Sequence, residues 1–303
     1  EERTAVCCLS SVNLEEYDEW KNDKNFIPDL IRMLDNVITY FVENAPDTLS
    51  KAKFSAKMER SLGLGAMGFH AYLQRKNIPF ESPMAVGVNK LMFGHIKKEA
   101  VNATKNLAVE RGEAPDAVGE GVRNVHLLAV APNASSSIIC GNTSPSIEPY
   151  RANAFTQKTK SGSSLLKNEY LEHILQELGE DTDEVWKSII TNNGSVQHLE
   201  FLDEWTKDVF KTAVEIDQRW IIEMAADRQK EICQSQSLNI FFPANVSKQE
   251  LHAIHMMAWK KKVKTLYYLR SEAIKRAETV SDEALRQYIF ESMDEEGCLA
   301  CEG

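Results

Sequence analysis

The sequence lacks the features that several classes of protein require. Among its 303 residues, 35 Lys and Arg stand against 45 Asp and Glu, which gives a formal net charge of −10. An acidic chain of this kind lacks the clustered positive charge that binds nucleic-acid backbones. It also has no apolar run long enough to cross a bilayer and no signal-peptide pattern in its first residues. We therefore expect no nucleic-acid partner, no membrane partner and a cytoplasmic location.

Cysteine is scarce, and its spacing does not make the disulfide framework of a secreted protein. A reducing compartment is favoured, in which a functional thiol is catalytic or redox-active. Cys7 and Cys8 fall in an expected buried strand, either as small hydrophobes or with one of them facing a pocket, and we interpret Cys140 and Cys233 as structural. The cysteines are Cys7, Cys8, Cys140, Cys233, Cys298 and Cys301. Because the chain begins with Glu1 rather than Met, we expect that a segment precedes it or that a leader was removed.

Apolar periodicity predicts strands that alternate with helices. The expected strands cover 4–14, 122–132, 237–244 and 263–270, and the expected helices cover 30–41, 88–110, 163–178 and 204–228. Ser247 and Glu250 form a capping box that begins a further helix through Trp259. Strands separated by long helices predict an α/β architecture with a largely parallel sheet or barrel. We expect one compact unit over residues 1–289 and a flexible acidic tail over 290–303.

The segment GLGAMG (63–68) matches the pattern GxGxxG. A dinucleotide site needs a strand immediately before this pattern and an acidic residue about 20 positions later. The preceding residues are polar and helix-prone, and Glu81, at a suitable distance, lies in a proline-flanked loop. We therefore expect these glycines to permit close helix packing, and a nicotinamide cofactor is disfavoured.

Two further motifs each have an ordinary and a functional interpretation. The segment NASSS (133–137) follows an expected buried strand, and its hydroxyls and backbone N–H groups suit a phosphate, although composition alone favours an ordinary polar loop. Tyr267 and Tyr268 are adjacent in an expected strand, where neighbouring side chains point to opposite faces. They are either two tyrosines at the rim of the core or a redox-active pair.

Cys298 and Cys301 form a CxxC motif near the end of the chain. A zinc site would need a second pair of ligands, and the seven histidines show no such spacing near the motif. The motif also lacks the strand–helix context of a thioredoxin-like site. The remaining interpretation is a mobile dithiol. The neighbouring acidic residues should raise the pKa of its thiols. Such a dithiol can visit a buried disulfide, reduce it by thiol exchange and leave again.

Taken in order, these motifs resemble a single family. They are AVCCLSSVNL (5–14), RSLGLGAMGFHAYL (60–73), APNASSSIICGNTSPSIEPY (131–150), QSLNIFFP (236–243), VKTLYYLRS (263–271) and the CxxC of the tail. Over its whole length the chain is similar to the catalytic large (alpha) subunit of class I ribonucleoside-diphosphate reductase. Each motif alone is weak, whereas the ordered set is highly specific. The resemblance implies the C-terminal half of a ten-stranded α/β barrel with long flanking helices.

The resemblance also implies roles for particular residues. Cys7 matches the cysteine that forms a redox-active disulfide with a cysteine from earlier in the subunit. Tyr267 and Tyr268 match the pair that passes a radical from the small subunit toward the active-site cysteine, and Cys298 and Cys301 match the tail dithiol that exchanges with thioredoxin or glutaredoxin. The loop that binds the substrate's phosphates is matched by Pro132, Asn133, Ala134, Ser135 and Ser136. The short CxxC and the uncharged NASSS depart from the pattern of some members.

The resemblance implies reduction of a ribonucleoside diphosphate to its 2′-deoxy form, with no metal bound by this chain and with a radical supplied by the metal cofactor of the small (beta) subunit. The family's radical cysteine, the partner of Cys7 and the sites for allosteric nucleotides would belong to an N-terminal half. We therefore expect that half as a partner, whether the chain is a split subunit of phage or bacterial type, a processed piece or a shortened subunit. The alternative is a non-catalytic remnant that regulates by binding the small subunit or other large subunits.

Overall fold

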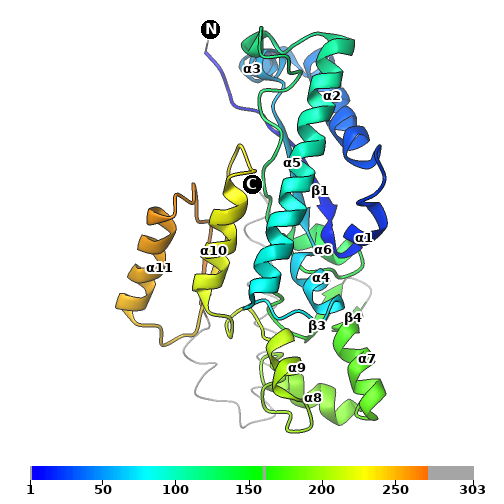
Figure 1. Ribbon diagram of the computed structural model, residues 1–303, viewed down its shortest axis with the longest axis vertical. Helices are drawn as coiled ribbons and strands as arrows, with labels where there is room; N and C mark the ends of the chain where they lie inside the picture. The colour runs from blue at the N-terminus through cyan, green and yellow to red at the C-terminus, as the bar shows by residue number, and fades with distance from the viewer. Residues whose placement is uncertain (1, 160–161, 272–303) are drawn as a thin grey trace.

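The computed structural model describes residues 2–159 and 162–271 (Figure 1). Its strands are β1 (Cys8–Asn13), β2 (Leu62–Met67), β3 (Ala154–Thr159), β4 (Gly162–Lys167), β5 (Ile240–Phe242) and β6 (Leu269–Ser271). Its helices are α1 (Tyr17–Trp20), α2 (Phe26–Asn44), α3 (Ser50–Glu59), α4 (Phe69–Arg75), α5 (Pro83–Arg111), α6 (Ala134–Ile139), α7 (Glu169–Leu178), α8 (Asp183–Thr191), α9 (Glu204–Val209), α10 (Gln218–Gln229) and α11 (Lys248–Lys260). The domain boundary expected at residue 289 and the tail after it lie outside the described residues.

A row of parallel extended segments runs through the described chain. β1 pairs in parallel with β2 along all six residues of each strand. On the far side of β2 lies the segment 126–130, where Leu128 bridges to Leu64 in parallel. Val130 bridges in turn to Gln236, which leads into β5, and β5 pairs in parallel with β6. The spatial order therefore follows the sequence order, as expected for a right-handed succession of strand and helix units.

This row confirms the α/β architecture with a parallel sheet. The expected strand at 122–132 is an extended segment joined to its neighbours by single bridges rather than by a continuous ladder. Within the described ranges the segments form no closed sheet.

Two long helices cover one side of the row. α2 and α5 lie side by side (Figure 1), and α2 also contacts β1 and β2. The predicted apolar stripe of α2 buries Ile31, Leu34 and Ile38 against this core. α5 begins where the Ser82 hydroxyl accepts a hydrogen bond from the backbone N–H of Ala85. Both helices predicted here are confirmed, and the side chains that they bury fix which face of β1 and β2 is covered.

A second, smaller core lies at one end of the molecule (Figure 1). It is formed by the β3–β4 hairpin with α7, α8 and α9, and it buries Leu171, Leu175, Trp186, Ile189 and Phe210 completely or nearly so. The sequence predicted a single helix over 163–178, but residues 162–167 belong to β4, which pairs antiparallel with β3. The helix begins only after Asn168, whose side-chain oxygen accepts hydrogen bonds from the next turn.

The single helix predicted over 204–228 was also wrong. The structure has α9 and α10 instead, separated by residues 210–217. The backbone N–H of Thr212 donates to the carboxylate of Glu215 at 2.7 Å, and Asp217 caps the first turn of α10. The apolar stripe continues through the break, where Ala213 and Ile216 are buried. Periodicity alone therefore concealed a polar turn that starts a new helix.

The glycines of GLGAMG lie in a strand, not between helices. All six residues of β2 are buried, and a Cβ on Gly65 would come within 2.4 Å of the carbonyl oxygen of Ala129. The glycines permit close approach of neighbouring backbones, which corrects the expectation of helix packing. Glu81 accepts a hydrogen bond from Lys211 at 2.7 Å and one from the backbone of Asp217 at 2.5 Å, so it joins two loops.

The strand predicted over 237–244 and the helix predicted to run through Trp259 are confirmed. β5 lies inside the expected strand 237–244 and is fully buried, and Ser247 caps α11 through a hydrogen bond from the backbone of Glu250 at 3.0 Å. Throughout residues 2–159 and 162–271, no helix combines the length and the apolar character needed to pass through a bilayer.

Candidate functional site

Cys7 lies immediately before β1 on an open face of the row of strands. Side chains alternate along a strand, and a Cβ on Gly63 would touch both Leu9 and the sulfur of Cys7, so these two side chains share one face. Cys7 and Leu9 are exposed, whereas Val12, on the helix-covered face, is only 2% exposed. The prediction that Cys7 is buried was wrong for the described chain.

Cys7 is exposed as a residue, but its thiol is partly desolvated by its neighbours. Partial burial raises the pKa of the Cys7 thiol, and a hydrogen bond with the side chain of Gln234 opposes this rise. Burial also raises the pKa of Cys8. A raised thiol pKa keeps Cys7 protonated near neutral pH.

The other two described cysteines differ from each other. The sulfur of Cys233 accepts hydrogen bonds from the backbone N–H groups of Leu127 and Leu128 at 3.2 and 3.3 Å, which fits a structural role. Cys140 is exposed just after α6, so the structural interpretation does not suit it. Cys298 and Cys301 lie outside the described residues.

The predicted phosphate segment forms the start of a helix rather than a loop. Asn133, with φ +54°, precedes α6, and Ala134, Ser135 and Ser136 form the first turn of that helix. All three are exposed. Pro132 ends the extended segment before them. The N–H groups at the beginning of a helix have no partner within the helix, so the first turn of α6 presents backbone donors. Phosphate binding by this segment stays a prediction.

A hydrogen bond ties this segment to β1. The hydroxyl of Ser11 donates to the side-chain oxygen of Asn133 at 3.1 Å, and the side-chain nitrogen of Asn133 donates to Ser136 at 3.2 Å. Ser11 lies four residues after Cys7, on the same face of the strand, which places it about 13 Å along β1 at ~3.3 Å per residue. The sequence analysis did not identify Ser11, because nothing in the sequence around a strand serine indicates which distant segment its hydroxyl will bond to.

Tyr267 and Tyr268 bring their rings together. The ring centroids are 4.2 Å apart and the ring planes meet at 58°, which contradicts the expectation that the two side chains point to opposite faces. The expected strand 263–270 is regular only from Leu269. Before it, the N–H of Tyr267 donates to Leu238 at 2.8 Å, and the carbonyl of Tyr268 accepts from Ile240 at 3.0 Å. Two consecutive residues thus bond to the same neighbouring segment, which breaks the alternation.

Glu148 is a charged group that sequence reasoning missed. It is 3% exposed, and burial raises the pKa of its carboxyl to about 7. Its two oxygens accept hydrogen bonds from the backbone and the side chain of Asn239, at 3.0 and 3.2 Å. In the sequence it stands in a loop-like segment, IEPY, where an exposed glutamate is the ordinary expectation.

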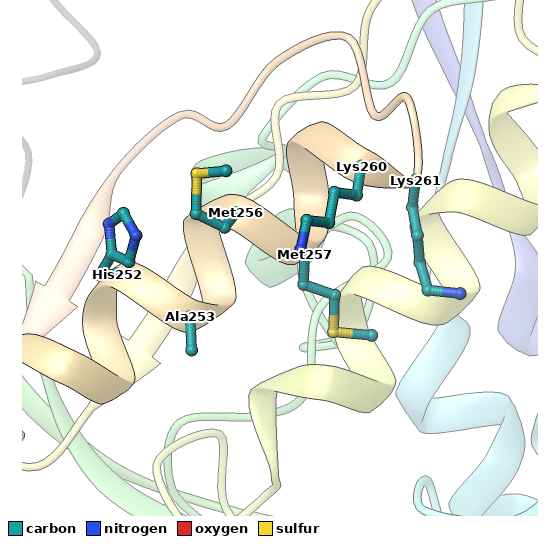
Figure 2. A pocket seen from close by; sticks show the side chains of 6 residues that line it. All are labelled: His252, Ala253, Met256, Met257, Lys260 and Lys261. Carbon is teal, nitrogen blue, oxygen red and sulfur yellow. The ribbon is translucent and has the colours of Figure 1, made fainter.

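Two surface hollows are lined by residues other than these. One lies over α11 and is lined by side chains of that helix and of the residue after it, as Figure 2 shows. A second lies between Glu81 and Pro243. Over residues 2–159 and 162–271, no three His, Cys, Asp or Glu side chains are grouped as metal ligands. The candidate site is therefore defined by Cys7, by the start of α6 and by the tyrosine pair.

Comparison with known proteins places this arrangement in a family. The model of the ribonucleotide reductase barrel domain matches residues 1–117 and 115–269. The match covers well over half of the chain, so the chain belongs to the ribonucleotide reductase barrel-domain family.

Particular relatives agree with this assignment. The chain is 54% identical over 283 residues to the ribonucleoside-diphosphate reductase large subunit of Invertebrate iridescent virus 6, covering 92% of this chain and 30% of that protein. It is 50% identical over 309 residues to a putative large subunit of Frog virus 3, covering 100% of this chain and 53% of that protein. A solved structure of the Actinobacillus ureae class Id ribonucleotide reductase alpha subunit matches with a TM-score of 0.84 and 40% identity, over 91% of this chain and 51% of that one. The chain thus spans about half, or less, of the proteins that it matches.

Proposed function

We propose that this chain is the C-terminal part of a class I ribonucleoside-diphosphate reductase large subunit, which converts ribonucleoside diphosphates to 2′-deoxyribonucleoside diphosphates. The observation that carries the proposal is that Cys7 and Ser11 share one open face of β1, and that Ser11 holds Asn133 of the phosphate segment. A redox thiol and a phosphate-binding turn thereby flank one surface on which a nucleotide can lie.

The parallel order of the extended segments supports the same proposal at the level of the fold. Five segments follow one another in sequence order, and Cys7 and Leu9 are exposed on one face beside β2. Five such segments make half of a ten-stranded α/β barrel. An N-terminal half supplies the other strands, the partner of Cys7, the radical cysteine and the allosteric nucleotide sites.

In this reaction Cys7 supplies half of the reducing equivalents. Its thiol and that of its partner cysteine give up two electrons and two protons, and the two sulfurs join as a disulfide. One proton leaves with the ribose 2′ hydroxyl as water, and the other proton and the two electrons form a new C–H bond at the 2′ carbon. The high pKa of the Cys7 thiol suits this role because the protonated thiol is the reactant. Residues 132–136 hold the substrate's phosphates through backbone N–H groups and hydroxyls at the start of α6.

Tyr267 and Tyr268 form the part of the radical relay that this chain supplies. A phenol can lose and regain one electron together with its proton, and rings at 4.2 Å are close enough to exchange them. The small subunit, with its own metal cofactor, supplies the radical. Cys298 and Cys301, in the tail over 290–303, reduce the disulfide of Cys7 and are themselves reduced by thioredoxin or glutaredoxin.

Reconstitution tests the proposal. The chain is mixed with an N-terminal half taken from a related large subunit, a small subunit, thioredoxin with its reductase, and a ribonucleoside diphosphate, and the deoxyribonucleoside diphosphate is measured by chromatography. We expect product only when both halves are present. A mixture that binds substrate and small subunit but forms no product would overturn the proposal and favour a regulatory remnant.

Two variants sharpen this experiment. Tyr267→Phe should abolish turnover, because phenylalanine cannot be oxidised at an accessible potential, whereas a regulatory effect would persist. Cys298→Ser with Cys301→Ser should abolish turnover with thioredoxin but leave it with a small dithiol that can reach Cys7 by diffusion. Cys140→Ser, which changes an exposed thiol outside the proposed pathway, is the matched control.

A further inference from the structure

The tyrosine pair is held by a short chain of hydrogen bonds that ends in a buried carboxyl group. The backbone N–H of Tyr268 donates to the side-chain oxygen of Asn239 at 3.0 Å. The side-chain nitrogen of Asn239 donates to one oxygen of Glu148 at 3.2 Å, and the backbone N–H of Asn239 donates to the other oxygen at 3.0 Å. Glu148 and Asn239 are 3% and 4% exposed, so water does not replace these bonds freely.

These bonds replace the ladder bond that Tyr268 lacks. In a regular parallel strand, alternate residues bond to a given neighbour, but here Tyr267 and Tyr268 both bond to the segment 238–240. The N–H of Tyr268 is left without a strand partner, and Asn239 accepts it. Arg270 lies over the ring of Tyr268, with its guanidinium carbon 4.5 Å from the ring centroid. The irregular backbone that brings the two rings together therefore depends on an accepting oxygen at Asn239.

Glu148 determines which way the Asn239 amide faces. Because both carboxylate oxygens are acceptors, the nitrogen of the amide must point to Glu148 and the oxygen to Tyr268. If one carboxyl oxygen became a donor, the amide would have to turn, and its nitrogen would then meet the N–H of Tyr268. A buried donor facing another donor costs the desolvation free energy of a lost hydrogen bond.

We propose that Glu148 and Asn239 are positioning residues for the tyrosine pair, with Glu148 fixing the orientation of the Asn239 amide and Asn239 fixing the backbone of Tyr268. The inference rests on the proposed function only for its consequence in turnover. The positioning itself is a property of the described chain.

Exchanging the hydrogen-bond donor and acceptor between residues 148 and 239 tests the inference directly. In Glu148→Gln alone, the new amide nitrogen faces the Asn239 nitrogen, so one hydrogen bond is lost whichever way Asn239 turns. In the double variant Glu148→Gln with Asn239→Asp, the Gln nitrogen donates to one Asp oxygen, and the other Asp oxygen accepts from Tyr268. All three bonds are restored, and the negative charge moves from residue 148 to residue 239. A role in packing alone predicts no such rescue.

The rate of hydrogen exchange at the backbone N–H of Tyr268 measures whether its hydrogen bond to Asn239 is present. The full chain is labelled with [¹⁵N]tyrosine, the Tyr268 signal is assigned with Tyr268→Phe, and its exchange into D₂O is followed by NMR. We expect Glu148→Gln and Asn239→Ala to speed Tyr268 exchange by about tenfold, the factor that one lost hydrogen bond supplies. The double variant should return it to within about threefold of the wild-type rate. Tyr267, whose N–H is bonded to Leu238, should stay protected in every variant and serves as the internal reference.

Two controls keep the outcome decisive. Asn124→Ala removes a buried amide that bonds to Arg60 and Asp35, far along the chain from the tyrosines, and should leave Tyr268 exchange unchanged. If the double variant exchanges as fast as Glu148→Gln, or if Tyr267 and Tyr268 speed up together in all variants, the inference is overturned.

The pH profile of the same signal provides an independent measurement. Three charged groups interact electrostatically with Glu148. They are Arg151, Arg270 and Arg228, on three different segments. Arginines stay protonated across the neutral range, so Glu148 is the group among these that titrates. Tyr268 exchange, corrected for its intrinsic pH dependence, should change near pH 7 in the wild type and not in the double variant. A profile that is the same in both would contradict the assignment of Glu148.

Measurements of turnover distinguish failure of this inference from failure of the proposed function. In the reconstituted reductase, Glu148→Gln should lower kcat with little change in the substrate KM, and the double variant should recover it. If Tyr268 exchange follows the expected pattern while no variant forms product, the proposed function fails and the positioning stands.

Discussion

The Ser11 hydroxyl donates a 3.1 Å hydrogen bond to Asn133, which joins the middle of β1 to the residue that begins α6. The two residues are 122 positions apart in the sequence. Asn133 holds a left-handed conformation, with φ +54°, which asparagine tolerates better than most residues because its short side chain can bond locally. Ser11 therefore holds the segment proposed to bind phosphate in position relative to Cys7.

Ser11→Ala should weaken substrate binding without stopping turnover. Loss of one hydrogen bond is worth about 1 kcal/mol, so the KM for the ribonucleoside diphosphate should rise about fivefold while kcat changes little. Ser10→Ala, on the opposite face of the same strand, is the matched control. Steady-state kinetics of the reconstituted reductase measure both. An equal rise in KM for the two variants would show that the strand, rather than Ser11, sets the position of Asn133.

Gly65→Ala should destabilise the sheet strongly. Its Cβ would lie 2.4 Å from the carbonyl oxygen of Ala129, and a backbone atom cannot move aside as a flexible side chain can. We expect a loss of about 2–3 kcal/mol or more in the free energy of unfolding. Gly94→Ala, in the middle of α5 with no atom within 4 Å of the added Cβ, should instead stabilise the chain by about 0.5–1 kcal/mol. Urea unfolding followed by circular dichroism distinguishes these opposite signs.

Asp35→Asn should be among the most damaging single changes. Asp35 is fully buried and bonds to Arg60 at 2.8 Å and Arg111 at 3.0 Å, with Arg123 beside them. Removing the carboxylate leaves the buried guanidinium of Arg60 without an ion-pair partner, which costs about 3–5 kcal/mol. Asp47→Asn, at a fully exposed position, should change stability by less than ~0.5 kcal/mol. Comparable losses in both variants would refute the role assigned to Asp35.

Two buried groups should oppose each other in the pH dependence of stability. Burial lowers the pKa of His70 to about 3, from 6.5, so the unfolded chain binds the extra proton and stability from this group falls as the pH drops below 6.5. Burial raises the pKa of Glu148 to about 7, from 4.5, so the folded chain binds the proton first and stability from this group rises over the same drop.

Single variants should reveal how His70 and Glu148 each change the free energy of unfolding with pH. Between pH 6.5 and 5, each group contributes a change of about 2 kcal/mol in the free energy of unfolding, at 1.36 kcal/mol per pH unit. Relative to wild type, His70→Gln should therefore gain stability as the pH falls, and Glu148→Gln should lose it. Urea titrations at four pH values measure both. Parallel curves for wild type and either variant would show that the group in question does not titrate as its burial implies.

Local patterns in the sequence predicted much of the fold. The apolar stripe of α2 and the Ser247 cap of α11 each act within one or two turns of chain, where a single sequence carries the full signal. The errors arose where polar side chains interrupt an apolar stripe with short-range hydrogen bonds. Thr212 and Glu215 break a periodic helix, and Asn168 starts another, because local hydrogen bonds compete with an apolar stripe that continues on both sides.

In the candidate site, too, some features were predictable from the sequence and others depended on the tertiary structure. The order of motifs identified the family and marked Cys7, the phosphate segment and the tyrosine pair, because each is a contiguous stretch of residues. Which of these side chains meet was decided by the tertiary structure. The packing of distant strands joined Ser11 to Asn133, buried Glu148 against Asn239 and turned both tyrosine rings to one side. A sequence specifies donors, acceptors and periodicity, but a hydrogen bond between residues a hundred positions apart exists only once the strands that carry them are side by side.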